Sequence, residues 1–356
     1  MIDTSSVRYL DSETDTMNIS NENYKKFINN FGALKILVGR YKNYESKALL
    51  KFTGIGADYD SAVIISSKLT LKYADYYFKE KTGMTSFNVY RVLDDLNYTT
   101  ITYDSVNSSN FGSTSLGNYN GVVNDSSSID ITLDNQTVRD WLESAADSTY
   151  PNRNYGILLQ PEMSSSVIKG FYSFNNTTDL VPFVTVIYSK NNETDTLILN
   201  KSDYVTLSDA PVSIIPQDRF MLQNGIAFRN LLRFDLTKLP PNVIINNATL
   251  EFTLDNSLSF ISAETDKRLV IGTILDSSLK TDSLYTDAFL LDSIKYSVSL
   301  NPVFQRWNSG NLPNLGISMK NLFELQNLDN FVFYSPSYAD TTKRPRLKIT
   351  YTPRSQ

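Results

Sequence analysis

The two halves of the chain repeat one sequence pattern. Ala48–Phe52, with the letters ALLKF, resembles Asn230–Phe234, with the letters NLLRF. The later landmarks keep their order in both halves: the only two tryptophans, Trp141 and Trp307, and the alternating segments 184–188 and 347–351. Such repetition indicates a duplication, and a duplicated chain folds as two copies of one module. We therefore predict two domains, residues 1–190 and 191–356, separated in the polar stretch 190–194.

The spacing of apolar residues within each copy predicts β-strands. Residues 68–73 alternate strictly between polar and apolar, and 347–351 repeat that spacing, which is typical of strands with one buried face. Several short strands joined by polar turns, with little helix, indicate an antiparallel sandwich. Gly156 and Gly316, which precede matching apolar segments, are expected at tight bends or close backbone contacts.

One short helix is expected in each copy, at residues 134–142 and 301–307. The first offers an N-cap aspartate followed by apolar residues at i, i+3 and i+4, and the second has proline in its first turn. Trp141 and Trp307 lie at equivalent places in these helices. We interpret both tryptophans as core anchors rather than as platforms on which sugars stack.

The chain contains neither histidine nor cysteine, and these absences exclude whole classes of chemistry. Without cysteine there is no disulfide, thiolate nucleophile or iron–sulfur cluster. Without histidine there is no imidazole base and no usual ligand for zinc, copper or haem. We expect no enzymatic activity and no cofactor. A bound metal would have to be a hard cation held by Asp, Asn and backbone oxygens, and calcium fits that description best.

Charge excludes another class of partner. The formal net charge is −5, whereas nucleic-acid binding needs a basic surface. The one basic run, 343–348, is expected to form the solvent face of the last strand. The acidic residues Asp11, Glu13 and Asp15, and the pair at 94–95, are expected to be solvated charge in a flexible end and in a turn, rather than glycosidase carboxylates.

The first 20 residues carry no basic segment followed by an apolar core, so we expect no signal peptide. No stretch approaches the roughly 18 consecutive apolar residues of a membrane span, so we expect no membrane insertion.

These motifs resemble those of the bacterial DNRLRE domain, a jelly roll similar to carbohydrate-binding modules. The second copy carries LLRFDL at 231–236 and RPRLKITY at 344–351. The first carries FNVYRV at 87–92 and TITY at 100–103, which look like the middle strands of the family, but has Thr53 where the family has aspartate. The resemblance implies an all-β protein of two tandem antiparallel jelly-roll β-sandwich domains, each with one short helix. It predicts the fold better than it predicts a ligand.

The most ligand-like feature is a crowd of aromatic residues in the first copy, at 73–78 and in the loop around residue 119. Exposed aromatic rings beside asparagine and aspartate suit a sugar or a protein partner. We therefore predict a glycan-binding or partner-binding site at Tyr76, Tyr77, Tyr119 and Asn120. Packing of these rings at a strand edge or between modules is the alternative, because aromatic residues favour strands in any case.

Two functional interpretations remain open. One is a non-enzymatic structural protein of a tailed-bacteriophage virion, in the baseplate, the tail or the capsid decoration. Its partners would be other virion proteins in a homo- or hetero-oligomeric assembly, and it could contact host surface polysaccharide. The alternative is a pair of carbohydrate-binding modules of a bacterial surface or of a polysaccharide-degrading system, located outside the cell or at the cell surface. A sandwich fold alone does not decide between them.

Overall fold

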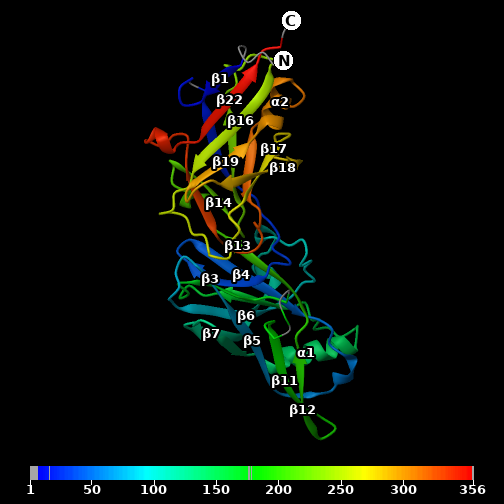
Figure 1. Cartoon of the computed structure of the whole chain (residues 1–356). Helices are drawn as coiled ribbons and strands as arrows, with labels where there is room; N and C mark the ends of the chain where they lie inside the picture. Colours follow the sequence, from blue (N-terminus) through cyan, green and yellow to red (C-terminus); the bar gives the residue numbers. More distant parts are fainter. Residues whose placement is uncertain (1–6, 16, 175–176, 178, 355–356) are drawn as a thin grey trace. The chain divides into compact units, whose positions relative to one another are not determined.

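The computed structural model describes residues 7–15, 17–174, 177 and 179–354. It is an all-β protein with two curled antiparallel sheets of eleven strands each (Figure 1). Two compact units contain one sheet each. Unit 1 consists of residues 1–26, 212–324 and 329–356, and unit 2 of residues 27–211 and 325–328. The predicted fold class, two β-sandwich modules with one α-helix each, is confirmed.

Unit 2 contains the strands β3 to β13 and helix α1. Their bounds are β3 (Lys35–Tyr41), β4 (Tyr44–Phe52), β5 (Val63–Phe78), β6 (Thr85–Val92), β7 (Phe111–Gly121), β8 (Ser128–Thr132), α1 (Asn135–Ala146), β9 (Ile157–Pro161), β10 (Ile168–Tyr172), β11 (Phe183–Lys190), β12 (Glu193–Leu199) and β13 (Ser202–Asp209). The segment 100–103, which was expected to be a strand, is instead a turn that leads into a short 3-10 helix at Tyr103–Ser105.

Unit 1 contains the strands β14 to β22, helix α2, and the two strands that open the chain. Their bounds are β1 (Arg8–Asp11), β2 (Ile19–Lys25), β14 (Arg219–Gln223), β15 (Phe228–Phe234), β16 (Ile244–Thr253), β17 (Leu269–Ile274), β18 (Thr281–Leu290), β19 (Lys295–Ser299), α2 (Asn301–Asn308), β20 (Ile317–Asn321), β21 (Asn330–Tyr334) and β22 (Arg346–Thr352).

The same strand pairing occurs in both units. The pairs β4–β9, β9–β6 and β6–β7 of unit 2 recur in unit 1 as β15–β20, β20–β17 and β17–β18. Likewise β8–β5 and β5–β11 recur as β19–β16 and β16–β22. The duplication seen in the sequence is therefore also present in the structure.

The first two strands of each copy complete the sheet of the other copy. In unit 1, β1 pairs with the last strand, β22, and β2 pairs with β15. In unit 2 the equivalent partners, β11 and β4, are paired by β12 and β13, which are the first two strands of the second copy. The two copies have thus exchanged their opening strands, and we call this arrangement the strand exchange.

The strand exchange makes the predicted domain boundary at residues 190 and 191 wrong. Asn191 and Asn192 have φ angles of 54° and 65° and form the two-residue turn of the hairpin β11–β12. Two successive residues with positive φ are the signature of a type I′ turn, for which asparagine is well suited. The polar stretch is therefore a tight turn within unit 2, and not a linker.

Each unit has its own apolar core with one tryptophan. Trp141 of α1 is 1% exposed and stacks on Phe52 at 5.8 Å between ring centroids. Trp307 of α2 is 7% exposed and packs against Phe234 at 6.0 Å. Both tryptophans are core anchors, as predicted. Within the described residues, no helix is long and apolar enough to cross a membrane.

The equivalent glycines also lie where the sequence predicted a bend. Gly156 and Gly316 have φ angles of +102° and +97°, a region that side chains disfavour. In both modules the asparagine two residues earlier donates its side-chain amide to a carbonyl of the central strand: Asn154 to Phe52 and Asn314 to Phe234, each at 2.8 Å. The Asn-x-Gly motif therefore joins the bend to the strand beside it.

Candidate functional site

The aromatic site predicted in the first copy is not an open platform. Tyr76 is only 4% exposed, and its hydroxyl accepts a hydrogen bond of 2.9 Å from the backbone N–H of Leu328. Lys35 Nζ lies 5.6 Å from the centre of its ring. Tyr76 therefore holds the segment 325–328 in unit 2, and the prediction that it is available for stacking is corrected.

The other predicted residues lie on two ladders: Tyr77 on β5–β10, next to Tyr76, and Tyr119 and Asn120 on β6–β7. Tyr77 is half-buried on β5, with the buried Lys169 Nζ 5.9 Å from its ring centre. Tyr119 lies on β7 and packs its ring on Phe87 of β6 at 5.9 Å. Asn120 is exposed. The ring contacts of Tyr76 and Tyr119 therefore lie within unit 2, and a glycan or partner contact at Tyr77 and Asn120 stays a prediction.

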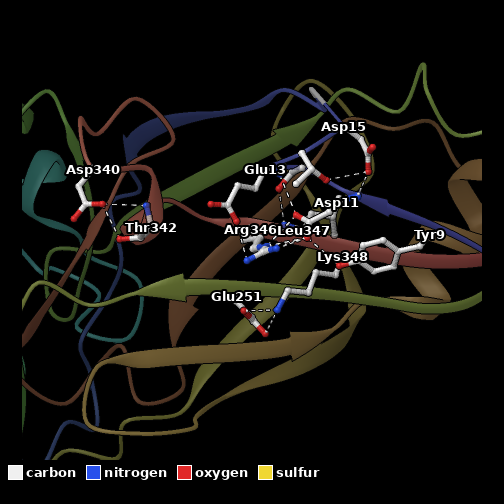
Figure 2. Close-up of polar contacts among 12 residues, drawn as sticks. Tyr9, Asp11, Glu13, Asp15, Glu251, Asp340, Thr342, Arg346, Leu347 and Lys348 are labelled. Carbon is white, nitrogen blue, oxygen red and sulfur yellow. Dashed lines mark hydrogen bonds and ion pairs between the residues drawn. The ribbon is translucent and has the colours of Figure 1, made fainter.

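A second site joins two features that the sequence presented separately. The acidic cluster near the start lies on β1 and the loop after it, and the basic run lies on and before β22, so the pairing of these strands brings both together (Figure 2). The resulting charged pocket has a volume of about 350 Å³. It is lined by Ser12, Glu13, Glu251, Thr253, Lys295, Thr341, Thr342, Arg344, Pro345 and Arg346.

Asp11 is the centre of the charge network beside the pocket. It is 1% exposed, and Arg346 Nε donates to its two oxygens at 2.9 and 3.0 Å. The Tyr9 hydroxyl and the backbone N–H of Glu13 donate to the same carboxylate at 2.9 and 3.0 Å. Burial alone would raise the pKa of Asp11, but these hydrogen bonds and the charge of Arg346 outweigh it and lower the pKa to about 2.

The remaining charges of the pocket are partly paired. Glu13 binds Arg346 Nη1 at 2.8 Å, and Glu251 binds Lys348 Nζ at 2.9 Å. Among the described residues, no carboxylate forms an ion pair with Lys295 or Arg344, although both line the pocket. The pocket therefore combines paired carboxylates with two additional cations and several hydroxyl groups.

The duplication provides an internal comparison for this pocket. In unit 2 the ladder positions of Arg346 and Asp11 are occupied by Phe183 and Ile198. Ile198 is 47% exposed, so the same sheet face is apolar there. Since unit 2 forms its sandwich without charges at these two positions, the fold does not require them there.

The pairing of Asp11 predicts a loss of stability in acid. Its folded pKa of about 2 lies below the ordinary value of 3.8, so its contribution is present above pH 4 and is lost as the pH falls towards 2. The shift corresponds to about 1–2 kcal/mol after allowance for solvent, because the Arg346 side chain is 38% exposed. Asp11→Asn should therefore destabilise the protein at pH 7 and flatten the decline of Tm between pH 4 and pH 2.

Thermal unfolding at several pH values would measure this difference. Asp95→Asn is the matched control, because the Asp95 side chain is 72% exposed and forms a 3.3 Å ion pair with Lys51. An equally steep decline for the wild type and Asp11→Asn would show that Asp11 does not carry the effect.

The sequence did not place the acidic cluster correctly. It was expected in a flexible end, but Asp11 is buried and its loop is closed by hydrogen bonds, among them Asp15 N–H to Asp11 C=O at 2.8 Å. The exposed Asp95 carboxylate fits the turn charge that was expected at 94–95. In the described part of the chain, no group of three or more acidic residues could hold a metal ion. The expectation of no cofactor, with calcium as the possible metal, stays a prediction.

The fold and the site define a tandem β-sandwich protein with a charged pocket in one module. Comparisons with known proteins do not assign it to a family. No protein-family model matches the chain, and no curated protein matches it. A solved structure of the infectious bursal disease virus VP2 subviral particle is 9% identical, with 96% of this chain and 77% of that chain covered, at a TM-score of 0.15. A likeness at that level carries no argument.

Proposed function

We propose that this chain is a non-enzymatic structural protein of a virion, in the baseplate, tail or capsid decoration of a tailed bacteriophage. The strand exchange is the observation that carries the proposal. Independent binding modules on one chain are commonly joined by a linker, which lets each bind separately and adds avidity. Here each sandwich needs two strands from the other copy, so neither copy forms its complete sheet alone.

The chemistry of the charged pocket also favours a non-enzymatic role. General acid–base catalysis needs a carboxylate whose pKa lies near the working pH. Asp11 has the opposite property, since its pKa is lowered to about 2, and Glu13 and Glu251 are held in ion pairs. These carboxylates stabilise strands β1, β22 and β16 rather than act on a substrate.

Mass spectrometry of purified phage particles tests the virion proposal. We expect the chain at a fixed copy number relative to the portal or tail proteins, in a multiple that matches the symmetry of one substructure. Immunogold labelling would then locate that substructure. Absence of the chain from particles that contain all other tail proteins would contradict the proposal.

The charged pocket supports the alternative, a carbohydrate-binding pair. Its hydroxyl groups and the additional cations Lys295 and Arg344 suit a polar ligand, and the ladder positions of Arg346 and Asp11 carry the apolar Phe183 and Ile198 in unit 2. A glycan array with the purified chain should then show binding that Lys295→Gln and Arg344→Gln weaken. Lys68→Gln, a surface change in unit 2, is the matched control. No binding to any glycan would leave the structural role as the better explanation.

A further inference from the structure

We propose that β1 and β2 of one molecule of this protein complete unit 1 of a second, identical molecule. The partner is therefore the chain itself, and its contact surface is the pair of strand edges that β1 and β2 occupy. The inference goes beyond the proposed virion role, because it names the partner and the mode of assembly and can be tested on the purified protein.

The acceptor surface is specific for these two strands. It offers the open edge of β22 to β1 and that of β15 to β2. Met17 and Ile19, which are 4% and 7% exposed, enter the core of unit 1. Two arginines of the acceptor, Arg346 and Arg233, form ion pairs with acidic residues of the donor segment, the latter with Glu22 at 2.9 Å. The strand pairing, the core contacts of Met17 and Ile19, and the two ion pairs together fix one register of β1 and β2 on unit 1.

The donor segment is joined to unit 2 by a short connection. The N–H of Lys26 still donates to Ala227 C=O of unit 1 at 3.1 Å. Three residues later, the Asn29 side-chain amide donates to Tyr98 C=O and Ile101 C=O of unit 2 at 2.9 and 2.6 Å. A short hinge between two such anchors is a condition that favours domain swapping.

Exchange between two molecules preserves the contacts that β1 and β2 make with unit 1. The same ladders, core contacts and ion pairs form whichever copy supplies β1 and β2, so concentration decides between the two forms. A tethered segment has an effective concentration on the order of millimolar, and the crowding of subunits in an assembly reaches that range. The existing exchange between the two copies within one chain already uses this kind of strand donation.

The exchange also makes the charged pocket a shared site. Ser12 and Glu13 would come from the donor, while Lys295, Arg344 and Arg346 belong to the acceptor. A ligand of the pocket would therefore contact two subunits, and would stabilise the exchanged form if it binds both.

Cysteine cross-linking tests the proposal. The chain contains no cysteine, so only the introduced cysteines can form disulfides. Tyr9 and Thr350 lie directly opposite each other on β1 and β22, at a spacing that suits a disulfide. A Tyr9→Cys chain and a Thr350→Cys chain with different tags are mixed, unfolded, refolded together at high concentration and oxidised. We expect a covalent heterodimer whose yield rises with protein concentration.

Two variants control the experiment. Asn247 of β16 lies opposite Thr350 on the other side of β22. Both strands stay in the same molecule when β1 and β2 are exchanged, so mixed Asn247→Cys and Thr350→Cys chains should give no heterodimer. The double variant Tyr9→Cys/Thr350→Cys should close an internal disulfide at low concentration, which verifies folding and geometry. If the double variant closes but the mixed Tyr9→Cys and Thr350→Cys chains never cross-link, the proposal is overturned, whatever the virion test shows.

Discussion

Deletion of residues 1–26 should unfold unit 1 and leave unit 2 folded. The deletion removes β1 and β2, which form four and seven residue pairs with β22 and β15. It also takes Met17 and Ile19 out of the core, at about 2 kcal/mol each, and leaves Arg346 without Asp11. Domains are stable by only about 5–15 kcal/mol, so losing two ladders and part of the core should leave unit 1 unfolded at 25 °C.

The tryptophans allow each unit to be followed separately. Trp141 lies in unit 2 and Trp307 in unit 1, so Trp141→Phe and Trp307→Phe give chains in which fluorescence reports one unit. In the deletion variant, the Trp307 signal should be that of an unfolded unit, while the Trp141 signal keeps its native unfolding transition. A native-like Trp307 signal after the deletion would show that the opening strands are dispensable.

Addition of the missing segment provides the control for this deletion. A separate peptide of residues 1–26 should restore the Trp307 signal, because the contacts it makes do not depend on a covalent connection. A peptide with Asp11→Asn and Ile19→Asn should restore it poorly. Rescue by the native peptide would also show that unit 1 binds β1 and β2 from a separate molecule, as the proposed exchange between two molecules requires.

Local sequence patterns predicted the elements of this fold but not the partners of its strands. Alternation at 347–351 and the apolar spacing around Trp141 depend on neighbours in the sequence, and these elements appear where expected. Pairing of β1 with β22 joins residues from opposite ends of the chain, and no periodicity specifies it. The two copies present equivalent strand edges to their first two strands. The sequence is therefore equally compatible with a fold in which each copy completes its own sheet. The boundary prediction failed for this reason.

The candidate site was only partly predictable for a similar reason. The acidic cluster and the basic run were both visible in the sequence, but each taken alone is typical of solvated charge. They become a site only through the ladder that places Asp11 beside Arg346, 335 residues apart. Conversely, the aromatic composition around Tyr76 indicated a ligand, whereas the hydroxyl is used by the backbone of Leu328. Composition cannot distinguish a buried aromatic ring from an exposed one.

Gly316→Ala should lower the free energy of unfolding of unit 1 by about 2–6 kcal/mol. Two costs add at this position. The φ of +97° disfavours any side chain, at about 1–3 kcal/mol. A Cβ would also lie 2.3 Å from the carbonyl oxygen of Leu232, a backbone atom that cannot move without breaking the β15–β20 ladder, and overpacking of this kind costs about 1–3 kcal/mol.

Gly310→Ala separates these two costs. Gly310 has a φ of +72°, and a Cβ there would meet nothing within 4 Å, so only the backbone cost, again about 1–3 kcal/mol, is expected. Denaturant unfolding followed by Trp307 fluorescence would compare both variants in one unit. A larger loss for Gly316→Ala would show that close approach to the Leu232 carbonyl, and not only the backbone angle, requires glycine after the Asn-x motif. Equal losses would mean that the strand beside the bend yields to the added methyl group.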